Sequence, residues 1–154
     1  MQEKYKKVYT LNALISETNG AYHSLSRELG ISDSVMQVLY TALVQGGSCT
    51  VRDACLLTGN SKQTINSALR KMEAQGLVVL TAVDGKKKRI CLTQAGEQLA
   101  RNTAGKELDL EAAILDSWPP EDTENYLRLT KRYLDDLRRG LLTLTKDRKE
   151  ENEQ

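Results

Sequence analysis

The sequence predicts a mainly α-helical fold that carries one small β-hairpin, and three observations lead to this prediction. The 154-residue chain contains only two prolines, the adjacent Pro119 and Pro120, and a long proline-free stretch favours long helices. Apolar residues recur at spacings of three, four and seven, which is the pattern of amphipathic helices. A strong turn signal, Asp84-Gly85, lies between two short aliphatic runs and indicates a hairpin.

The first thirty residues predict a long amphipathic helix that Gly30 ends. Its apolar stripe consists of Val8, Leu11, Ile15, Tyr22, Leu25 and Leu29. A second helix is expected to begin at Ser32 or Asp33, which are both good N-caps, and to end at Gly46. Its apolar positions are Val35, Met36, Val38, Leu39, Ala42 and Leu43. Each of these two helices therefore has one apolar face to bury.

Two shorter helices are expected next. Thr50 is a good N-cap for a third helix, which Gly59 and Asn60 end because both residue types tolerate positive φ. Ser61 caps a fourth helix, which Gly76 ends. The inward positions of the fourth helix are Ile65, Ala68, Leu69 and Met72. Two helices of this length, joined by so short a glycine-containing turn, are typical of a helix-turn-helix.

The hairpin follows the fourth helix directly. Residues 77–81 have the composition of a strand, and residues 90–92 form the returning strand. The cations between the turn and that strand are Lys86, Lys87, Lys88 and Arg89. Four consecutive cations are poor material for a buried strand, so we expect a wing, an arm that reaches into solvent or into a DNA groove.

The remainder of the chain is expected to be helical. Thr93 caps a fifth helix in which Gly105 is a candidate interruption. Trp118 and the two prolines form a corner, from which Pro120 begins a last helix that runs to about Lys146. The leucines of the last helix lie at 127, 134, 137, 141 and 144. Their spacing resembles that of a coiled coil.

The net charge of +1 conceals a strong segregation of charge along the chain. Residues 61–93 contain seven Lys/Arg and two acids, whereas residues 94–125 contain two Lys/Arg and eight acids. A basic segment of this kind suits a polyanion, although charge runs are also common on ordinary solvated surface.

The outward face of the fourth helix is polar and cationic. Its residues are Ser61, Lys62, Gln63, Thr64, Asn66, Ser67, Arg70 and Lys71. Such a helix fits the major groove of duplex DNA, where Gln and Asn side chains can pair with adenine edges. Ser61 and Thr64 could bind phosphates near the start of the helix, and the cations of the wing can meet phosphates or the minor groove.

Residues 50–99 resemble the core of the MarR family of bacterial transcription regulators. The matching residues are Ser61 to Ile65, Leu69, Met72 to Val78, Asp84 in the wing, and Leu92 to Gly96. The flanking helices match the family in order and length, so the resemblance covers nearly the whole chain. It implies a winged helix-turn-helix with N- and C-terminal dimerisation helices, and a regulator that binds double-stranded DNA.

Two positions depart from the pattern of that family. Its wing usually carries Asp followed two residues later by Arg, where this chain has Asp84 and Lys86, and many members have Arg at the position of Ser67. Because Arg forks into a groove in ways that Lys cannot copy, we expect Lys86 to contact phosphate only. The three cations that follow Lys86 could supply the missing charge.

Proteins of the family that this chain resembles are homodimers, which agrees with the two apolar stripes at its ends. A homodimer places two recognition helices on one face and suits a pseudo-palindromic operator. Residues 1–154 are expected to form one domain, with a DNA-binding lobe at 32–99 and dimerisation helices at 1–30 and 100–146. The polar residues 147–154 are expected to fray. We expect repression by blocking of a promoter, with activation as the alternative.

Catalysis is not expected, and neither a metal nor a cofactor is predicted. The chain has one histidine, His23, and no glycine-rich phosphate loop. Cys49 and Cys55 are six residues apart, which fits no usual zinc spacing. No signal peptide or membrane-spanning segment is evident, and the odd number of cysteines suits a reducing compartment, so a cytoplasmic protein is expected.

Three further hypotheses stay open. In the family that this chain resembles, small aromatic ligands often bind between the dimerisation helices and the DNA-binding lobe, and Tyr9, Tyr22 and His23 could line such a site; packing at a dimer interface is the favoured interpretation of these residues. Cysteines could sense oxidants, although plain packing is the simpler interpretation. The wing could instead dock on a protein, which the polar and cationic surface of the fourth helix argues against.

Overall fold

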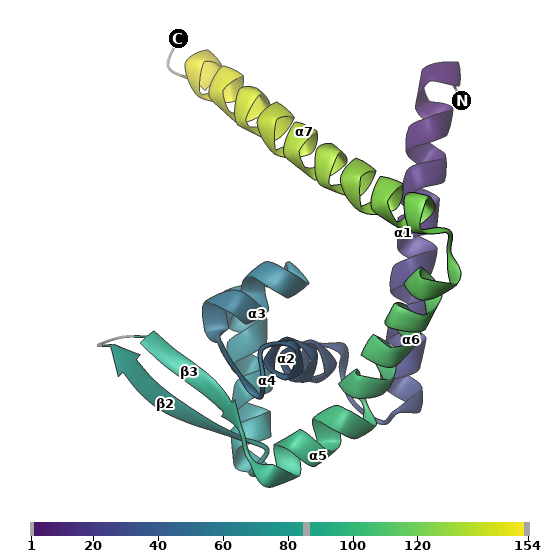
Figure 1. The fold of residues 1–154 in the computed structure, drawn as a ribbon. Helices are drawn as coiled ribbons and strands as arrows, with labels where there is room; N and C mark the ends of the chain where they lie inside the picture. The colour runs from purple at the N-terminus through teal and green to yellow at the C-terminus, as the bar shows by residue number, and fades with distance from the viewer. Residues whose placement is uncertain (1, 85–86, 153–154) are drawn as a thin grey trace. The chain divides into compact units, whose positions relative to one another are not determined.

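The computed structural model describes residues 2–84 and 87–152, and it has the mainly helical fold with a small sheet that the sequence predicts (Figure 1). The elements are α1 (Glu3–Glu28), α2 (Asp33–Val44), β1 (Ser48–Thr50), α3 (Val51–Thr58), α4 (Lys62–Ala74), β2 (Val78–Asp84), β3 (Lys87–Leu92), α5 (Gln94–Asn102), α6 (Ala104–Ser117) and α7 (Pro120–Asn152). They form two compact units, residues 1–109 and 110–154.

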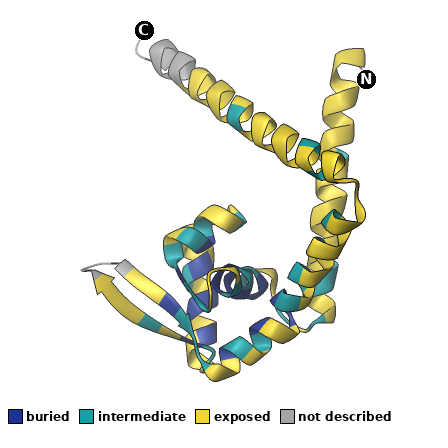
Figure 2. Cartoon of the chain, viewed as in Figure 1, coloured by how far each residue is buried: buried dark blue, intermediate teal, exposed yellow. Residues whose placement is uncertain are grey.

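The hydrophobic core of the first unit is built around α2 (Figure 2). Helices α1, α3, α4 and α5 all pack against it. The expected inward residues of α4 are confirmed, because Ile65, Ala68, Leu69 and Met72 are all buried. Leu39 of α2 is completely buried in the same cluster. This packing fixes which face of α4 is left for solvent.

The sheet contains one strand more than the expected hairpin. Its order is β1-β3-β2, and both pairings are antiparallel. The additional strand β1 pairs Ser48 with Cys91 and Thr50 with Arg89. A strand of only three residues has no readable alternation, and its partner lies about forty residues further along the chain, so the sequence pattern did not reveal it.

Three of the expected helix caps are confirmed by hydrogen bonds. The hydroxyl groups of Thr50, Ser61 and Thr93 accept the backbone N–H groups of residues 53, 64 and 96, respectively. Ser32 occupies the N-cap position of α2, but its side chain makes no capping hydrogen bond. The helices of the helix-turn-helix and the helix after the wing therefore begin where their capping residues place them.

Gly96 allows α5 to pack closely against the strand that begins the wing. A Cβ atom at this position would lie 1.9 Å from the carbonyl oxygen of Leu77. That oxygen is held in place because it accepts the N–H of Thr93, whose hydroxyl also donates to the carbonyl of Gly76 at 2.7 Å. The base of the wing is therefore fixed by α5, and only glycine fits at residue 96.

The helical region after the wing is broken earlier than expected. Gly105 was the candidate interruption, but it lies inside α6, and the break falls at Thr103 between α5 and α6. Thr103 is buried and has φ −122° and ψ −83°, outside the helical values. Its hydroxyl donates to the carbonyl of Leu99 at 2.7 Å. The interruption thus comes from a buried threonine and not from the conformational freedom of glycine.

The second unit contains the corner that the prolines predict. Pro120 is the first residue of α7, and Trp118 packs edge-on against Tyr126 with ring centroids 5.5 Å apart. The hydroxyl of Thr123 donates to the carbonyl of Leu115 at 3.0 Å, across the corner. Helix α7 continues to Asn152, beyond its expected end near Lys146.

Candidate nucleic-acid interface

The turn between α3 and α4 is held by Asn60 and by two side chains that the sequence analysis did not name, those of Thr58 and Gln37. Gly59 has φ 68°, which favours glycine, and so ends α3. The backbone N–H of Asn60 donates to the hydroxyl of Thr58 at 3.2 Å, and the Asn60 amide donates to the side-chain oxygen of Gln37 on α2. The start of α4 is therefore tied to α2, the centre of the core.

Helix α4 carries its predicted contact residues on the surface, with one exception. Ser61, Lys62, Gln63, Thr64, Ser67, Arg70 and Lys71 are exposed, whereas Asn66 is half-buried. The hydroxyl groups of Ser61 and Thr64 lie 2.9 Å apart, and the Ser61 hydroxyl also caps the helix. These two hydroxyls are therefore partly occupied by each other, while Gln63 is directed to solvent.

The cations of this surface are not neutralised by neighbouring acids. Within residues 2–84 and 87–152, Lys62, Arg70 and Lys71 take part in no ion pair or hydrogen bond that involves their charged groups. An exposed row of unpaired cations on a helix with a buried apolar face produces a positive surface. Such a surface is complementary to the phosphates of duplex DNA.

The wing is described in part. The backbones of Asp84 and Lys87 pair across the hairpin, but Lys86 lies outside the described residues and the side chains of Asp84 and Lys87 are not described. Lys88 is exposed. Arg89 is exposed at the base of the wing, and its Nη1 donates to the hydroxyl of Ser48 at 3.2 Å. Arg89 is thus held by β1, close to α3.

The residues considered for an effector do not form one site within a chain. Tyr9 is 65% exposed, and it precedes Tyr22 by thirteen residues on α1. Thirteen residues of helix correspond to about 20 Å, so one small aromatic molecule cannot touch both tyrosines. His23 is engaged by Asp33, with Nδ1 and Oδ2 2.8 Å apart, and so ties α1 to the first residue of α2.

The three cysteines are free thiols with differing exposure. Cys49 is buried, and this burial, with the negative charge of Asp53 as a smaller cause, raises the pKa of its thiol to about 11. A thiol with so high a pKa is a poor nucleophile at neutral pH. Cys55 and Cys91 are half-buried. No group of three or more His, Cys, Asp or Glu side chains in the described part of the chain could hold a metal ion.

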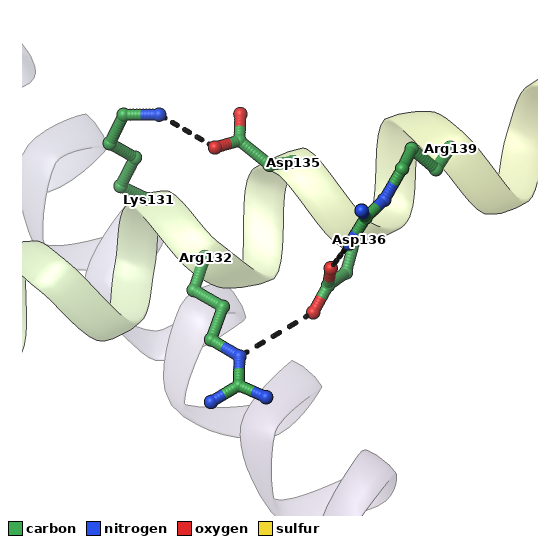
Figure 3. A network of polar contacts seen from close by, with 5 residues as sticks. All are labelled: Lys131, Arg132, Asp135, Asp136 and Arg139. Carbon is green, nitrogen blue, oxygen red and sulfur yellow. Dashed lines mark hydrogen bonds and ion pairs between the residues drawn. The ribbon is translucent and has the colours of Figure 1, made fainter.

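Helix α7 has two contrasting surfaces. Its polar surface carries ion pairs between neighbouring turns: Lys131 with Asp135 at 2.6 Å, and Arg132 and Arg139 with Asp136 (Figure 3). Helix α7 also exposes large apolar side chains, most of them on its other surface. They are Tyr126, Leu127, Leu129, Tyr133, Leu134, Leu137, Leu141, Leu142 and Leu144.

None of the helices that the structure describes has the length and hydropathy needed to cross a membrane.

The comparison with protein families matches part of this chain. The model of the MarR family matches residues 29–89, which include α2, the helix-turn-helix and most of the wing. No curated protein matches the sequence of this chain significantly.

Solved structures of MarR regulators share the fold over most of the chain. A MarR family regulator from Neisseria meningitidis superposes with a TM-score of 0.79 at 15% identity, over 88% of this chain and 96% of the other. The S. aureus MepR–DNA complex gives 0.68 at 18% identity, over 88% and 99%. BpsR from Bordetella bronchiseptica, whose DNA binding is regulated by 6-hydroxynicotinic acid, gives 0.61 at 15% identity, over 80% and 97%.

Proposed function

We propose that this chain is a winged helix-turn-helix transcription regulator of the MarR type, a DNA-binding protein and not an enzyme, and that it acts as a repressor that binds a pseudo-palindromic operator as a homodimer. The observation that carries this proposal is the surface of α4. Its inward residues form the core, and its outward residues are exposed, polar and without ion-pair partners among the described residues. We place α4 in the major groove of double-stranded DNA, with the wing beside it.

The proposed contact residues are those expected from the sequence. They are Ser61, Lys62, Gln63, Thr64, Asn66, Ser67, Arg70 and Lys71 on α4, and Asp84, Lys86, Lys87, Lys88 and Arg89 in the wing. Gln63 is the residue we assign to base reading, since its exposed amide can donate to and accept from one adenine edge. The half-buried Asn66 has less freedom to do so. The cations are assigned to phosphates.

The homodimer is proposed from the apolar surface of α7. Five leucines spaced seven, three, four and three residues apart are exposed on it, and one helix cannot bury them alone. The exposed apolar residues of α1, among them Val8, Leu14 and Ile15, provide a second surface of the same kind. A second copy of the chain supplies two such surfaces at once. It also supplies the second α4 that a palindromic site requires.

An effector is proposed by analogy with BpsR, whose DNA binding is regulated by an aromatic acid. Such a ligand would weaken DNA binding through a coupling between sites. Tyr9 on the one hand, and Tyr22 with His23 on the other, would belong to different sites in a chain, because α1 separates them. The repressor is proposed to act in the cytoplasm, where its DNA lies.

Fluorescence anisotropy of the purified protein tests the proposed function. One duplex is taken from upstream of its own gene and the other is a scrambled duplex of equal length, both at low and near-physiological salt. Tight binding that survives salt only on the upstream duplex supports a self-regulating, sequence-specific factor. Equal binding to both duplexes, or binding to neither, would contradict specific recognition of that region.

The role of Gln63 in base reading is tested by replacing it with alanine, and Gln98, another exposed glutamine, is replaced as the control. Gln63→Ala is expected to weaken specific binding by about 1–3 kcal/mol at one base pair and to relax the preference there. Gln98→Ala, at an exposed position of α5, is the control and is expected to bind like the unaltered protein. Equal losses in both variants, or no loss in Gln63→Ala, would show that α4 does not read the bases as proposed.

A further inference from the structure

Arg52 lies in the first turn of α3, beside the base of the wing. Thr50 ends β1, caps α3 and is the register partner of Arg89 on β3. Arg52 follows Thr50 by two residues and is exposed. Arg89, on the other side of Thr50, is held by its hydrogen bond to Ser48. Two arginines from different elements, Arg52 on α3 and Arg89 on β3, therefore lie near Thr50 in the sequence or in the strand register, and the charges of both act on Asp53.

The acid between them is already engaged. The carboxylate of Asp53 accepts the hydroxyl of Thr50 at 2.7 Å and the N–H of Thr50 at 2.9 Å. These two hydrogen bonds hold the pKa of Asp53 below its usual value, and the charges of Arg89 and Arg52 act in the same direction. The charges of Arg52 and Arg89 therefore act on one carboxylate, that of Asp53, whose hydrogen bonds are made to Thr50 in the cap of α3. The positive charge of the pair is only partly offset.

Most other arginines with described contacts have partners on their own helix. Arg101 pairs with Glu97 at 2.9 Å, and Arg132 and Arg139 share Asp136. In the part of the chain that the structure describes, the guanidinium of Arg52 makes no hydrogen bond and lies within 4 Å of no carboxylate. Arg52 is thus an exposed cation that the fold leaves available to an external anion.

We propose that Arg52 contacts a backbone phosphate of duplex DNA, outside the groove that α4 occupies. This inference rests on the proposed DNA-binding function. In a helix-turn-helix the first helix crosses the DNA backbone while the second enters the major groove, and α3 is the first helix here. Contacts to phosphates carry no sequence information, but they fix the register and orientation of the protein on the duplex. Arg52 is therefore a positioning residue for α4.

The test measures the salt dependence of binding to two duplexes, the specific one described above and one of random sequence. Each phosphate that a protein cation neutralises contributes about 0.9 to the magnitude of the slope of log K against log salt. Arg52→Ala removes one such contact from each of the two chains, so we expect the magnitude of the slope to fall by about 1.8 per dimer. The loss of affinity is expected to be the same factor on both duplexes. Arg52→Lys keeps the charge and is expected to keep the slope.

The matched control is Arg101→Ala, which removes the same charge from α5, where Glu97 already pairs with it. Its slope is expected to equal that of the unaltered protein. An unchanged slope in Arg52→Ala, an equal drop in Arg101→Ala, or a loss confined to the specific duplex would overturn the assignment of Arg52. If the unaltered protein binds neither duplex, the proposed function fails, and the inference fails with it. Thermal unfolding of Arg52→Ala is expected to match the unaltered protein.

Discussion

The winged-helix lobe and helix α7 use their apolar and charged residues in opposite ways. In the lobe, the apolar residues of α2 and α4 are buried and the cations on the surface of α4 have no described acidic partner. In α7, Lys131, Arg132 and Arg139 pair with acids one turn away, and the leucines are exposed (Figures 2 and 3). The lobe has its own hydrophobic core, and the unpaired cations of α4 suit a polyanion. Helix α7 has ion pairs along its own polar surface, and its exposed leucines would gain from an apolar partner.

The difference shows that the kind of side chain that an element leaves exposed and unpaired indicates the kind of partner it can bind. An unpaired cation in water gains from an approaching phosphate because counterions are released. An ion pair on a helix surface gains little from any further contact, since each charge is already partly neutralised. Exposed leucines gain from any apolar surface that excludes water. These physical differences are the reason why we propose DNA as the partner of the α4 surface and a second copy of the chain as the partner of the α7 surface.

The largest expected effect comes from placing charge in the apolar surface of α7. Leu134 and Leu137 are 42% and 45% exposed in the chain. We expect Leu134→Asp with Leu137→Asp to convert a dimer into a monomer, because each buried leucine contributes about 1.5–3 kcal/mol and is counted in both copies. Light scattering coupled to size exclusion measures the mass.

The control for the α7 experiment is Arg132→Ala with Arg139→Ala, which changes the polar surface of the same helix. We expect that variant to remain dimeric. A monomeric unaltered protein, or a dimer that survives the two aspartates, would show that the leucines of α7 are not an interface. The lobe of the monomeric variant is expected to keep its fold, since none of its core residues is changed.

A smaller effect is expected from the core of the lobe. Ile65 is completely buried beneath the surface of α4. Ile65→Ala is expected to lower the free energy of unfolding by about 2–5 kcal/mol, measured by urea denaturation. Leu56→Ala, at a 68% exposed position on the neighbouring α3, is the control and is expected to change it by less than about 0.5 kcal/mol. Similar losses in both variants would mean that Leu56 is covered in solution.

The smallest effect concerns two carboxylates with lowered pKa values. Asp53 belongs to the capping box of α3, so Asp53→Ala is expected to cost about 1 kcal/mol of stability at neutral pH. The pKa of Asp53 is lower in the folded chain, so this contribution is complete above its ordinary value of 3.8 and is lost as the pH falls through the folded value.

The matched carboxylate on α7 is Asp135, whose pKa is lowered mainly by its hydrogen bond from Lys131. Because that pair is exposed to water, Asp135→Ala is expected to leave the unfolding midpoint unchanged. Urea denaturation at pH 7 and at pH 3 measures the effect of each variant on the free energy of unfolding and so distinguishes the contributions of the two carboxylates. A cost of Asp53→Ala that persists in full at pH 3 would show that the cap does not depend on the ionised form.

Much of the lobe could be predicted from single residues. Ser61 and Thr93 mark the starts of their helices because their hydroxyls satisfy backbone N–H groups that no helix can satisfy itself. The spacing of Ile65, Ala68, Leu69 and Met72 identified the buried face of α4, and hence the outward Gln63 and Arg70. These are local relations, in which neighbours along the chain decide the outcome.

Other features depended on contacts between distant parts of the chain. Strand β1 exists because β3 is beside it, and the break at Thr103 falls where that residue is buried. Gln37 and Asn60, 23 residues apart, hold the recognition helix through an amide pair that no spacing rule predicts. The same β1–β3 pairing places Arg89 opposite Thr50, the residue that caps α3.

The sequence by itself determined the mainly helical fold, the helix caps and the buried face of α4. It also determined which cations lie on the exposed face of that helix. These follow from helical periodicity and from the chemistry of capping residues. The tertiary structure decided which of those cations have acidic partners and which leucines remain uncovered. That difference arises because pairing and burial are properties of neighbours in space, and the chain brings such neighbours together only when it is folded.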